Sequence, residues 1–161
     1  IGEYCDAVEE LKTQYPTAVF QGLGGVHHNP STLEKETLLK RFKNLGIDYL
    51  GEQPSSAPYL DKAQVVVLPS YREGTPRALL EALATGRAII TTDVPGCRET
   101  VVDGLNGIMV KPQDAKDLAR AMGYLLDHPE LIEPMGKASY QLALDKFDVN
   151  RVNDLIISKI D

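Results

Sequence analysis

Two glutamates, Glu73 and Glu81, stand on either side of a short segment that predicts the beginning of a helix. Gly74 leaves room for a ligand at the backbone, Thr75 is of a type that caps helices, and Pro76 suits the first helical position. Backbone N–H groups at a helix start have no intrahelical partners and attract phosphate. Carboxylates, in contrast, accept hydrogen bonds from hydroxyls and repel phosphate. We therefore interpret this segment as a site for a ligand that carries both sugar hydroxyls and a diphosphate.

The predicted helix, residues 77–85, is apolar almost all round and should be largely buried. Its charged members, Arg77 and Glu81, are four positions apart and share one face. A buried carboxylate needs a partner, so we expect Arg77, Arg87 or a polar ligand to pair with Glu81. A second interpretation stays open, in which the segment is only a buried helix with a structural ion pair.

The elements that must position these residues alternate between strand and helix patterns. Apolar runs without alternation, as at 65–68 and 88–90, are typical of strands buried on both faces of a parallel sheet. The predicted strands are 17–21, 47–51, 64–68, 87–92 and 107–110, and the predicted helices are 1–14, 31–44, 77–85, 114–127, 129–144 and 150–160. This alternation predicts an α/β fold, an open parallel sheet with helices on both faces. The loop before residue 77 should then lie at the carboxyl edge of the sheet, where such folds bind ligands.

Several residues predict where helices begin and end. Ser31, with Glu34 three positions later, fits a capping box, and Asp114 fits an N-cap. Gly46 and Gly86 fit positions just beyond helix ends. Pro134 should interrupt the helix at 129–144 or shift its start.

Composition limits the class of protein. The 161 residues carry a formal net charge of −6 and fit a single domain. Such an acidic chain lacks the basic footprint of a general nucleic-acid binder. Two cysteines, Cys5 and Cys97, are typical of a reduced, cytosolic protein, and their spacing gives no metal motif.

The segment 68–86 resembles the E-x7-E signature of the retaining glycosyltransferases of family 4, the group 1 transferases of the GT-B fold. The resemblance continues through 89–101 and 103–110 and includes 49–51 and 58–60, so it covers nearly the whole chain. The sequence at 72–77 and 95–101 is similar to the subgroup that builds bacterial surface polysaccharides and lipid-linked oligosaccharides.

The resemblance implies a fold and a domain. Enzymes of this family have two Rossmann-like domains with a cleft between them, and the C-terminal domain binds the nucleotide-sugar donor. The chain is therefore expected to be that domain alone, a single nucleotide-sugar-binding domain over 1–161 that is truncated at its N-terminus. The family's Arg and Lys just before the first helix, and its N-terminal domain, would then be missing, and the isolated chain is expected to transfer nothing.

The resemblance also assigns roles to residues. Glu73 would contact the hydroxyls of the donor sugar as the catalytic residue, and Glu81 would bind the ribose hydroxyls. Backbone N–H groups near Arg77 and Ala78 would hold the diphosphate. The donor-binding set implied in full is Gly74, Thr75, Pro76, Arg77, Ala78, Glu81, Glu52 and Gln53, with Glu52 and Gln53 near the base and with Gly24 and Gly25 in a glycine-rich turn.

The implied activity is transfer of a glycosyl group from a nucleotide sugar, with UDP-sugar favoured, to a lipid-linked or polysaccharide acceptor with retention. The resemblance implies no metal and no cofactor, and it implies a cytoplasmic location, with peripheral attachment to the cytoplasmic membrane face for the full-length protein. The alternative is a nucleotide-binding or interaction module without transferase activity. The pair of Glu73 and Glu81 favours the transferase, because a plain phosphate binder does not need two acids there.

Overall fold

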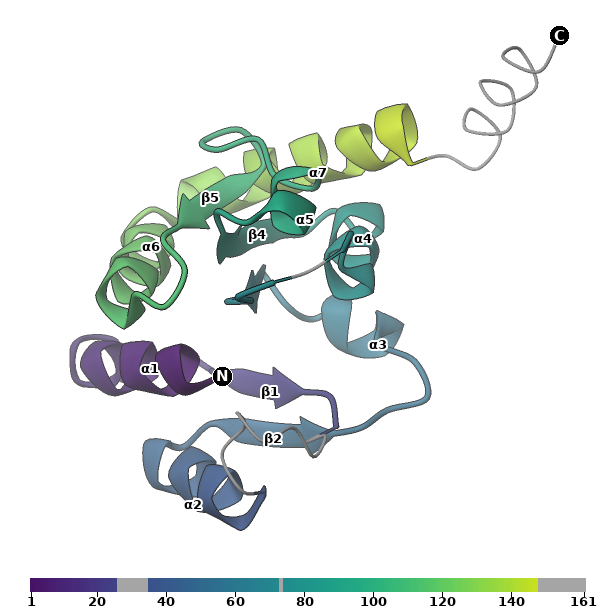
Figure 1. The fold of residues 1–161 in the computed structure, drawn as a ribbon. Coiled ribbons are helices and arrows are strands. Elements are labelled where there is room, and N and C mark those ends of the chain that lie inside the picture. The colour runs from purple at the N-terminus through teal and green to yellow at the C-terminus, as the bar shows by residue number, and fades with distance from the viewer. Residues whose placement is uncertain (26–34, 73, 148–161) are drawn as a thin grey trace, which may run out of the picture.

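The computed structural model describes residues 1–25, 35–72 and 74–147, in which helices and strands alternate (Figure 1). The helices are α1 (Gly2–Gln14), α2 (Lys35–Leu45), α3 (Ala57–Leu60), α4 (Arg77–Ala84), α5 (Pro95–Arg98), α6 (Ala115–Asp127) and α7 (Ile132–Lys146), with a 3-10 turn η1 (Pro129–Leu131) before α7. The strands are β1 (Gln21–Leu23), β2 (Asp48–Gly51), β3 (Val65–Leu68), β4 (Ala88–Thr92) and β5 (Gly107–Val110).

The described strands form two parallel sheets, one of β1 and β2 and one in the order β3-β4-β5. A helix lies in each crossover: α2 between β1 and β2, α4 between β3 and β4, and α5 between β4 and β5. Parallel pairing requires such crossovers, because the chain must return to the same end of the sheet. The predicted α/β architecture is confirmed, although the strands fall into two sheets and not one.

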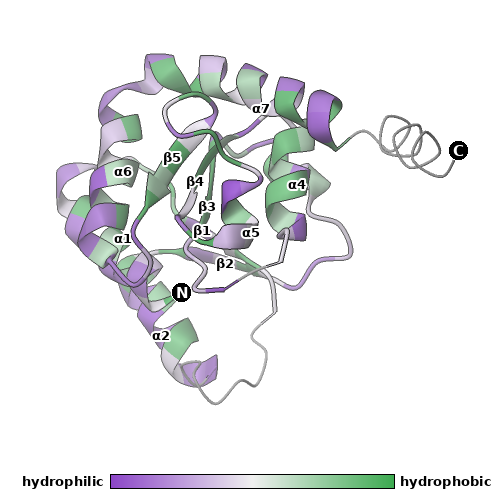
Figure 2. Ribbon diagram, turned by 45° about the horizontal axis from the view of Figure 1, so that its top comes forward, coloured by the Kyte–Doolittle hydropathy of each residue, from purple (hydrophilic) through white to green (hydrophobic). Residues whose placement is uncertain are grey.

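Both faces of the larger sheet are covered by helices. Side chains alternate along the strands, so that Ile90 faces α1 and α6 while Ile89 faces α4 and α7. All five residues of β4 are buried. Figure 2 shows these apolar strands between the two pairs of helices. Because helices cover both faces of the sheet, the strands do not alternate between apolar and polar residues.

One apolar core joins the two sheets. A single cluster of buried residues includes Phe20 and Phe42 beside the smaller sheet and Ile90 and Val110 of the larger one. Helix α1 lies at the centre of this cluster and packs along α6. The Tyr15 hydroxyl at the end of α1 also donates to Asp127 Oδ1 at 2.7 Å.

The first predicted strand was misplaced. The chain turns at Pro16, with the Ala18 N–H donating to the Tyr15 carbonyl at 3.1 Å, and β1 begins only at Gln21. Pairing with β2 begins where the Asp48 N–H donates to the Phe20 carbonyl at 2.9 Å. The position of β2 therefore decides which residues become β1.

The predicted helix ends are mostly confirmed. Asp114 caps α6, accepting a hydrogen bond from the Asp117 N–H at 2.9 Å. Gly46 and Gly86 have φ values of 63° and 65°, which glycine adopts without strain. Pro134 lies in the first turn of α7, since η1 takes the residues before it, and α7 continues to Lys146.

Two short helices were not predicted, and two predictions concern residues that the structure does not describe. The one-turn helices α3 and α5 were missed, because four residues carry too little periodicity to detect. The predicted capping box of Ser31 and Glu34 and the predicted helix 150–160 lie outside the described residues. Among the described helices, none has the length and apolarity needed to span a membrane.

Candidate functional site

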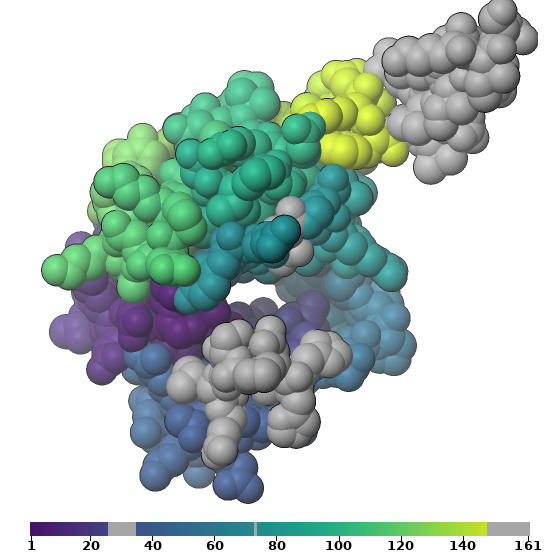
Figure 3. Space-filling view, in the orientation of Figure 1, coloured from purple at the N-terminus to yellow at the C-terminus, as the bar shows by residue number. Residues whose placement is uncertain are grey.

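The carboxyl ends of β3, β4 and β5 meet at one edge of the larger sheet, because the strands are parallel and in register. The segment from Pro69 to Pro76 leaves β3 at this edge and leads into α4. In the space-filling view, the teal surface of this segment borders a hollow, and purple and blue N-terminal elements lie on its other side (Figure 3). The predicted site segment therefore lies where the sequence placed it.

The start of α4 differs from the prediction by one residue. Pro76, with φ −69° and ψ 124°, is the N-cap, and the helix begins at Arg77. The Pro76 carbonyl accepts from the N–H groups of Leu79 and Leu80 at 3.0 and 3.1 Å. Thr75 is exposed and no side chain caps this helix, so its assignment as the N-cap was wrong. The extended ψ of Pro76 delays the turn into the helix by one residue.

This start leaves backbone donors available. Within the part of the chain that the structure describes, the N–H groups of Arg77 and Ala78 take part in no hydrogen bond. Arg77 and Ala78 are exposed, as is Gly74, which has no heavy atom within 4 Å of the place where a Cβ would stand. The positive end of the α4 dipole is thus open to an anion.

Glu81 lies one turn into α4 and is held by two donors. Its Oε2 accepts from the Ser56 hydroxyl at 2.5 Å, and its Oε1 accepts from Arg77 Nε at 2.8 Å. The hydrogen bond from Ser56 lowers the pKa of Glu81 most, burial opposes it, and Arg77 lowers it further. The Glu81 side chain is 31% exposed. It is therefore ionised, oriented and accessible, not sealed in the core.

The two arginines expected as partners behave differently. Arg77 pairs with Glu81, and its side chain is 91% exposed. Arg87 turns away and donates to the carbonyls of Ala63 and Thr85 at 3.0 and 2.9 Å. The guanidinium of Arg77 is thus paired with Glu81 and open to solvent, where an incoming anion could meet it.

Ser56 was not found by sequence reasoning. It is the N-cap of α3, and its hydroxyl reaches Glu81 instead of capping its own helix. A serine before an Ala-Pro pair suggests a cap, but no local pattern indicates a bond 25 residues away. This contact brings the loop after β2 against α4.

That loop also contains Glu52 and Gln53. Glu52 is exposed, and Gln53 Nε2 donates to the Leu50 carbonyl at 2.5 Å. Gly24 joins the neighbouring loop to it, since its N–H donates to the Gly51 carbonyl at 2.9 Å. Gly25 follows as an exposed residue. The loops after β1 and β2 are thus tied together, on the same side as Ser56. The predicted catalytic residue, Glu73, lies outside the described residues.

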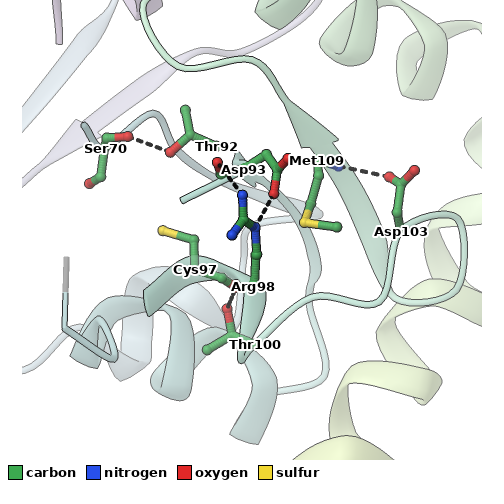
Figure 4. A network of polar contacts seen from close by, with 8 residues as sticks. All are labelled: Ser70, Thr92, Asp93, Cys97, Arg98, Thr100, Asp103 and Met109. Atoms are coloured by element: carbon green, nitrogen blue, oxygen red, sulfur yellow. Dashed lines mark hydrogen bonds and ion pairs between the residues drawn. The ribbon is translucent and has the colours of Figure 1, made fainter. Parts of the chain in front are cut away.

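Two threonines at the end of β4 hold the segment after β3. The Thr91 hydroxyl donates to the Leu68 carbonyl at 2.9 Å, and the Thr92 hydroxyl donates to the Ser70 carbonyl. Both threonines are buried. Figure 4 shows the Thr92 contact above the turn of α5.

An ion pair follows β4 on the same edge. Arg98 Nε donates to Asp93 Oδ1 at 2.5 Å, and this hydrogen bond lowers the pKa of Asp93 (Figure 4). Nearby, the Met109 N–H donates to Asp103 Oδ1 at 2.8 Å. Since Asp93 and Arg98 are both exposed, they add accessible charge to this edge at little gain in stability.

A hollow of about 370 Å³ lies between α4 and α7 and is lined by Leu80, Glu81, Tyr140 and Leu144, among others. A second, of about 750 Å³, lies at the turn between α4 and β4, next to Gly86. Neither is lined by residues 74–78. Over the described ranges, no group of three or more His, Cys, Asp and Glu side chains is arranged to hold a metal ion.

Comparison with known proteins gives consistent results. A family model described as "Glycosyl transferases group 1" matches residues 2–128. The N,N'-diacetylbacillosaminyl-diphospho-undecaprenol alpha-1,3-N-acetylgalactosaminyltransferase of Campylobacter jejuni is 34% identical over 151 residues, which are 93% of this chain and 38% of that protein. The chain thus spans well under half the length of this relative.

Solved structures share the fold. The C-terminal domain of LpcC, a group 1 glycosyl transferase of Francisella tularensis, matches with a TM-score of 0.78 and 25% identity over 91% of this chain and 78% of that one. HepE of Anabaena, solved in complex with UDP, matches with a TM-score of 0.75 and 17% identity over 99% of this chain and 54% of that one. At that identity, the likeness to HepE concerns the fold.

Proposed function

Because this chain belongs to the group 1 glycosyl transferases, we propose that it is the donor-binding domain of an enzyme that moves a sugar from a nucleotide sugar to an acceptor with retention. The domain extends over 1–161 and works with a preceding Rossmann-like domain. Its relatives support transfer of a sugar, and LpcC supports the assignment to a C-terminal domain.

The arrangement of α4 carries the proposal. Glu81 follows Arg77 by four residues, which is about 6 Å along a helix axis. A diphosphate on the N–H groups of Arg77 and Ala78 would therefore have its ribose beside the carboxylate. Glu81 is ionised and held by Ser56, so it can accept hydrogen bonds from ribose hydroxyls without reorganising. A phosphate site alone would not place an accessible carboxylate one turn from the helix start.

The residues at this edge suit the departure of a nucleoside diphosphate. The positive end of α4 and the Arg77 guanidinium stabilise the negative charge that develops as the bond to the sugar breaks. We propose that α4 and Arg77 stabilise this charge without a metal or another cofactor. Gly74, Thr75 and Pro76 form the surface over which the diphosphate lies, Glu52 and Gln53 lie near the base, and Glu73 contacts the sugar.

The donor and acceptor classes rest on relatives. HepE shares the fold and was solved in complex with UDP, and on this shared fold we base the proposal of a UDP-sugar donor. The name of the Campylobacter relative describes transfer to a diphospho-undecaprenol-linked sugar, which supports a lipid-linked acceptor. Such an acceptor would place the full-length enzyme at the cytoplasmic face of a membrane.

Isothermal titration of UDP, GDP, ADP and a UDP-sugar into the chain tests the proposal. We expect UDP to bind, and Glu81→Gln to weaken it about tenfold by removing a charged acceptor. Glu133→Gln is the matched control, because Glu133 is also in an i,i+4 pair, with Lys137 on α7. Equal binding by wild type and Glu81→Gln, or failure of all three nucleotides to bind, would contradict the site. Nucleotide binding without any gain from an attached sugar would favour the module without transferase activity.

A further inference from the structure

The segment that leads from β3 to α4 lies beyond the paired part of the larger sheet. Pairing of β3 with β4 ends at Leu68 and Thr91. Beyond it, the backbone bond of the described segment before Pro76 is one from the Ser70 N–H to the Leu68 carbonyl, at 3.1 Å. Contacts with other elements therefore help to set the direction in which the described part of this segment enters α4.

Thr92 makes the first of these contacts. Its hydroxyl donates to the Ser70 carbonyl, one step beyond the last paired residues of the sheet. Thr92 is 1% exposed, so its hydroxyl has no access to water and this bond satisfies it. The Thr92 side chain of β4 thus holds the chain that follows β3, beyond the point where backbone pairing between the two strands ends.

Tyr71 makes the second contact. Its hydroxyl donates to Glu3 Oε1 in the first turn of α1, and this bond raises the pKa of Tyr71 to about 12. The ring is 53% exposed, so burial does not account for its position. The bond connects the segment to the first helix, whereas Thr92 connects it to β4.

We propose that Thr92 and Tyr71 are positioning residues for the donor site, which fix the approach of the chain to Pro76 and thereby orient the N–H groups of Arg77 and Ala78. The identity of the ligand rests on the proposed function. The orientation of the two N–H groups, in contrast, is a property of the ligand-free protein. Neither side chain contacts the donor. Each acts through the backbone of the segment.

The chain offers matched controls for both residues. Thr100 is equally buried, and its hydroxyl donates to the Cys97 carbonyl at 2.8 Å within its own turn. Tyr15, like Tyr71, donates to an acid on a neighbouring helix, here Asp127. Removing these hydroxyls deletes the same chemical groups without touching the segment before α4.

The experiment combines titration with amide NMR on the full chain. We expect Thr92→Val to weaken UDP binding about fivefold, Tyr71→Phe to weaken it about threefold, and Thr92→Ser to restore it to within about twofold. Thr100→Val and Tyr15→Phe should leave the dissociation constant unchanged. In the ligand-free protein, the Arg77 and Ala78 amide resonances should move in Thr92→Val and return in Thr92→Ser.

Each outcome decides one claim. Unmoved Arg77 and Ala78 resonances in folded Thr92→Val, or equal weakening by Thr100→Val, would overturn the positioning role. If the resonances move as expected but wild type binds no nucleotide, the proposed function fails while the positioning of the amides stands.

Discussion

Glu81 combines a charge, partial burial and a fixed orientation in one side chain. Ser56 approaches it from another loop and Arg77 from the preceding turn, and together they hold its pKa below the ordinary value. A carboxylate with that environment both stabilises the fold and remains able to accept further hydrogen bonds. The Glu81 carboxylate therefore contributes both to the stability of the fold and to the proposed binding of the donor.

This pKa predicts a pH dependence. A carboxyl that binds its proton more weakly when folded stabilises the protein fully above its unfolded pKa, and the contribution is lost as the pH falls through the folded value. The advantage of wild type over Glu81→Gln in free energy of unfolding should therefore shrink between about pH 5 and pH 3. Urea unfolding of both proteins at several pH values measures this difference in free energy of unfolding.

Ser56→Ala provides the complementary test. Removal of the strongest cause of the shift should bring the pKa of Glu81 back toward its ordinary value, as followed by carbon NMR of the carboxylate. An unchanged titration curve in Ser56→Ala would show that the hydroxyl does not hold the carboxylate. Thr100→Val serves as control, since its hydroxyl lies away from Glu81.

At the scale of elements, two glycines set how α7 packs on the larger sheet. A Cβ on Gly136 of α7 would lie 2.3 Å from the carbonyl oxygen of Gly86, in the turn between α4 and β4. A backbone atom cannot move aside as the end of a side chain can. The close approach of helix and turn is therefore possible only without a side chain at this position.

Gly136→Ala should destabilise the protein by about 1–3 kcal/mol, because overpacking exceeds the gain in helix propensity. Gly123→Ala is the control: Gly123 is also a buried helical glycine, but its Cβ would meet side-chain atoms and no backbone, the end of Leu11 at 3.2 Å and the Tyr15 hydroxyl at 3.7 Å. We expect that control to be neutral or stabilising by up to about 1 kcal/mol. Urea unfolding measures the free energy of unfolding of both variants, and equal values for the two would contradict the packing argument.

At the scale of the whole molecule, the shared core makes the two sheets dependent on each other. Phe42 of α2 is 2% exposed and lies in the same buried cluster as Ile90 of β4. Although β1 and β2 do not pair with the larger sheet among the described residues, α1 packs against both α6 and α2, and its Tyr4 hydroxyl donates to the Gln21 carbonyl of β1 at 3.1 Å. We expect the chain to unfold as one unit.

Phe42→Leu tests this coupling. The substitution should lower the free energy of unfolding by about 1 kcal/mol and speed hydrogen exchange of the β4 amides about fivefold, although β4 belongs to the other sheet. Tyr124→Leu, at a half-exposed ring on α6, is the control and should change exchange little. Faster exchange confined to β1, β2 and α2 would mean that the smaller sheet opens by itself.

The sequence by itself determined what depends on neighbouring residues. The buried strand β4 follows from an unbroken apolar run, the end of α4 from Gly86, and the start of α6 from Asp114, because burial pattern, backbone freedom and capping act over a few positions. The acid at Glu81 and the adjacent helix start were found for the same reason.

Only the tertiary structure decided where distant groups meet. It selected Arg77 over Arg87 for Glu81, supplied Ser56 from another loop, moved β1 to the residues that β2 can pair, and attached the segment after β3 through Thr92 and Tyr71. The contacts of Ser56, Thr92 and Tyr71 join residues between 22 and 68 positions apart. Their free energies depend on the packing of helices and sheets around them, which no local pattern of residue types contains.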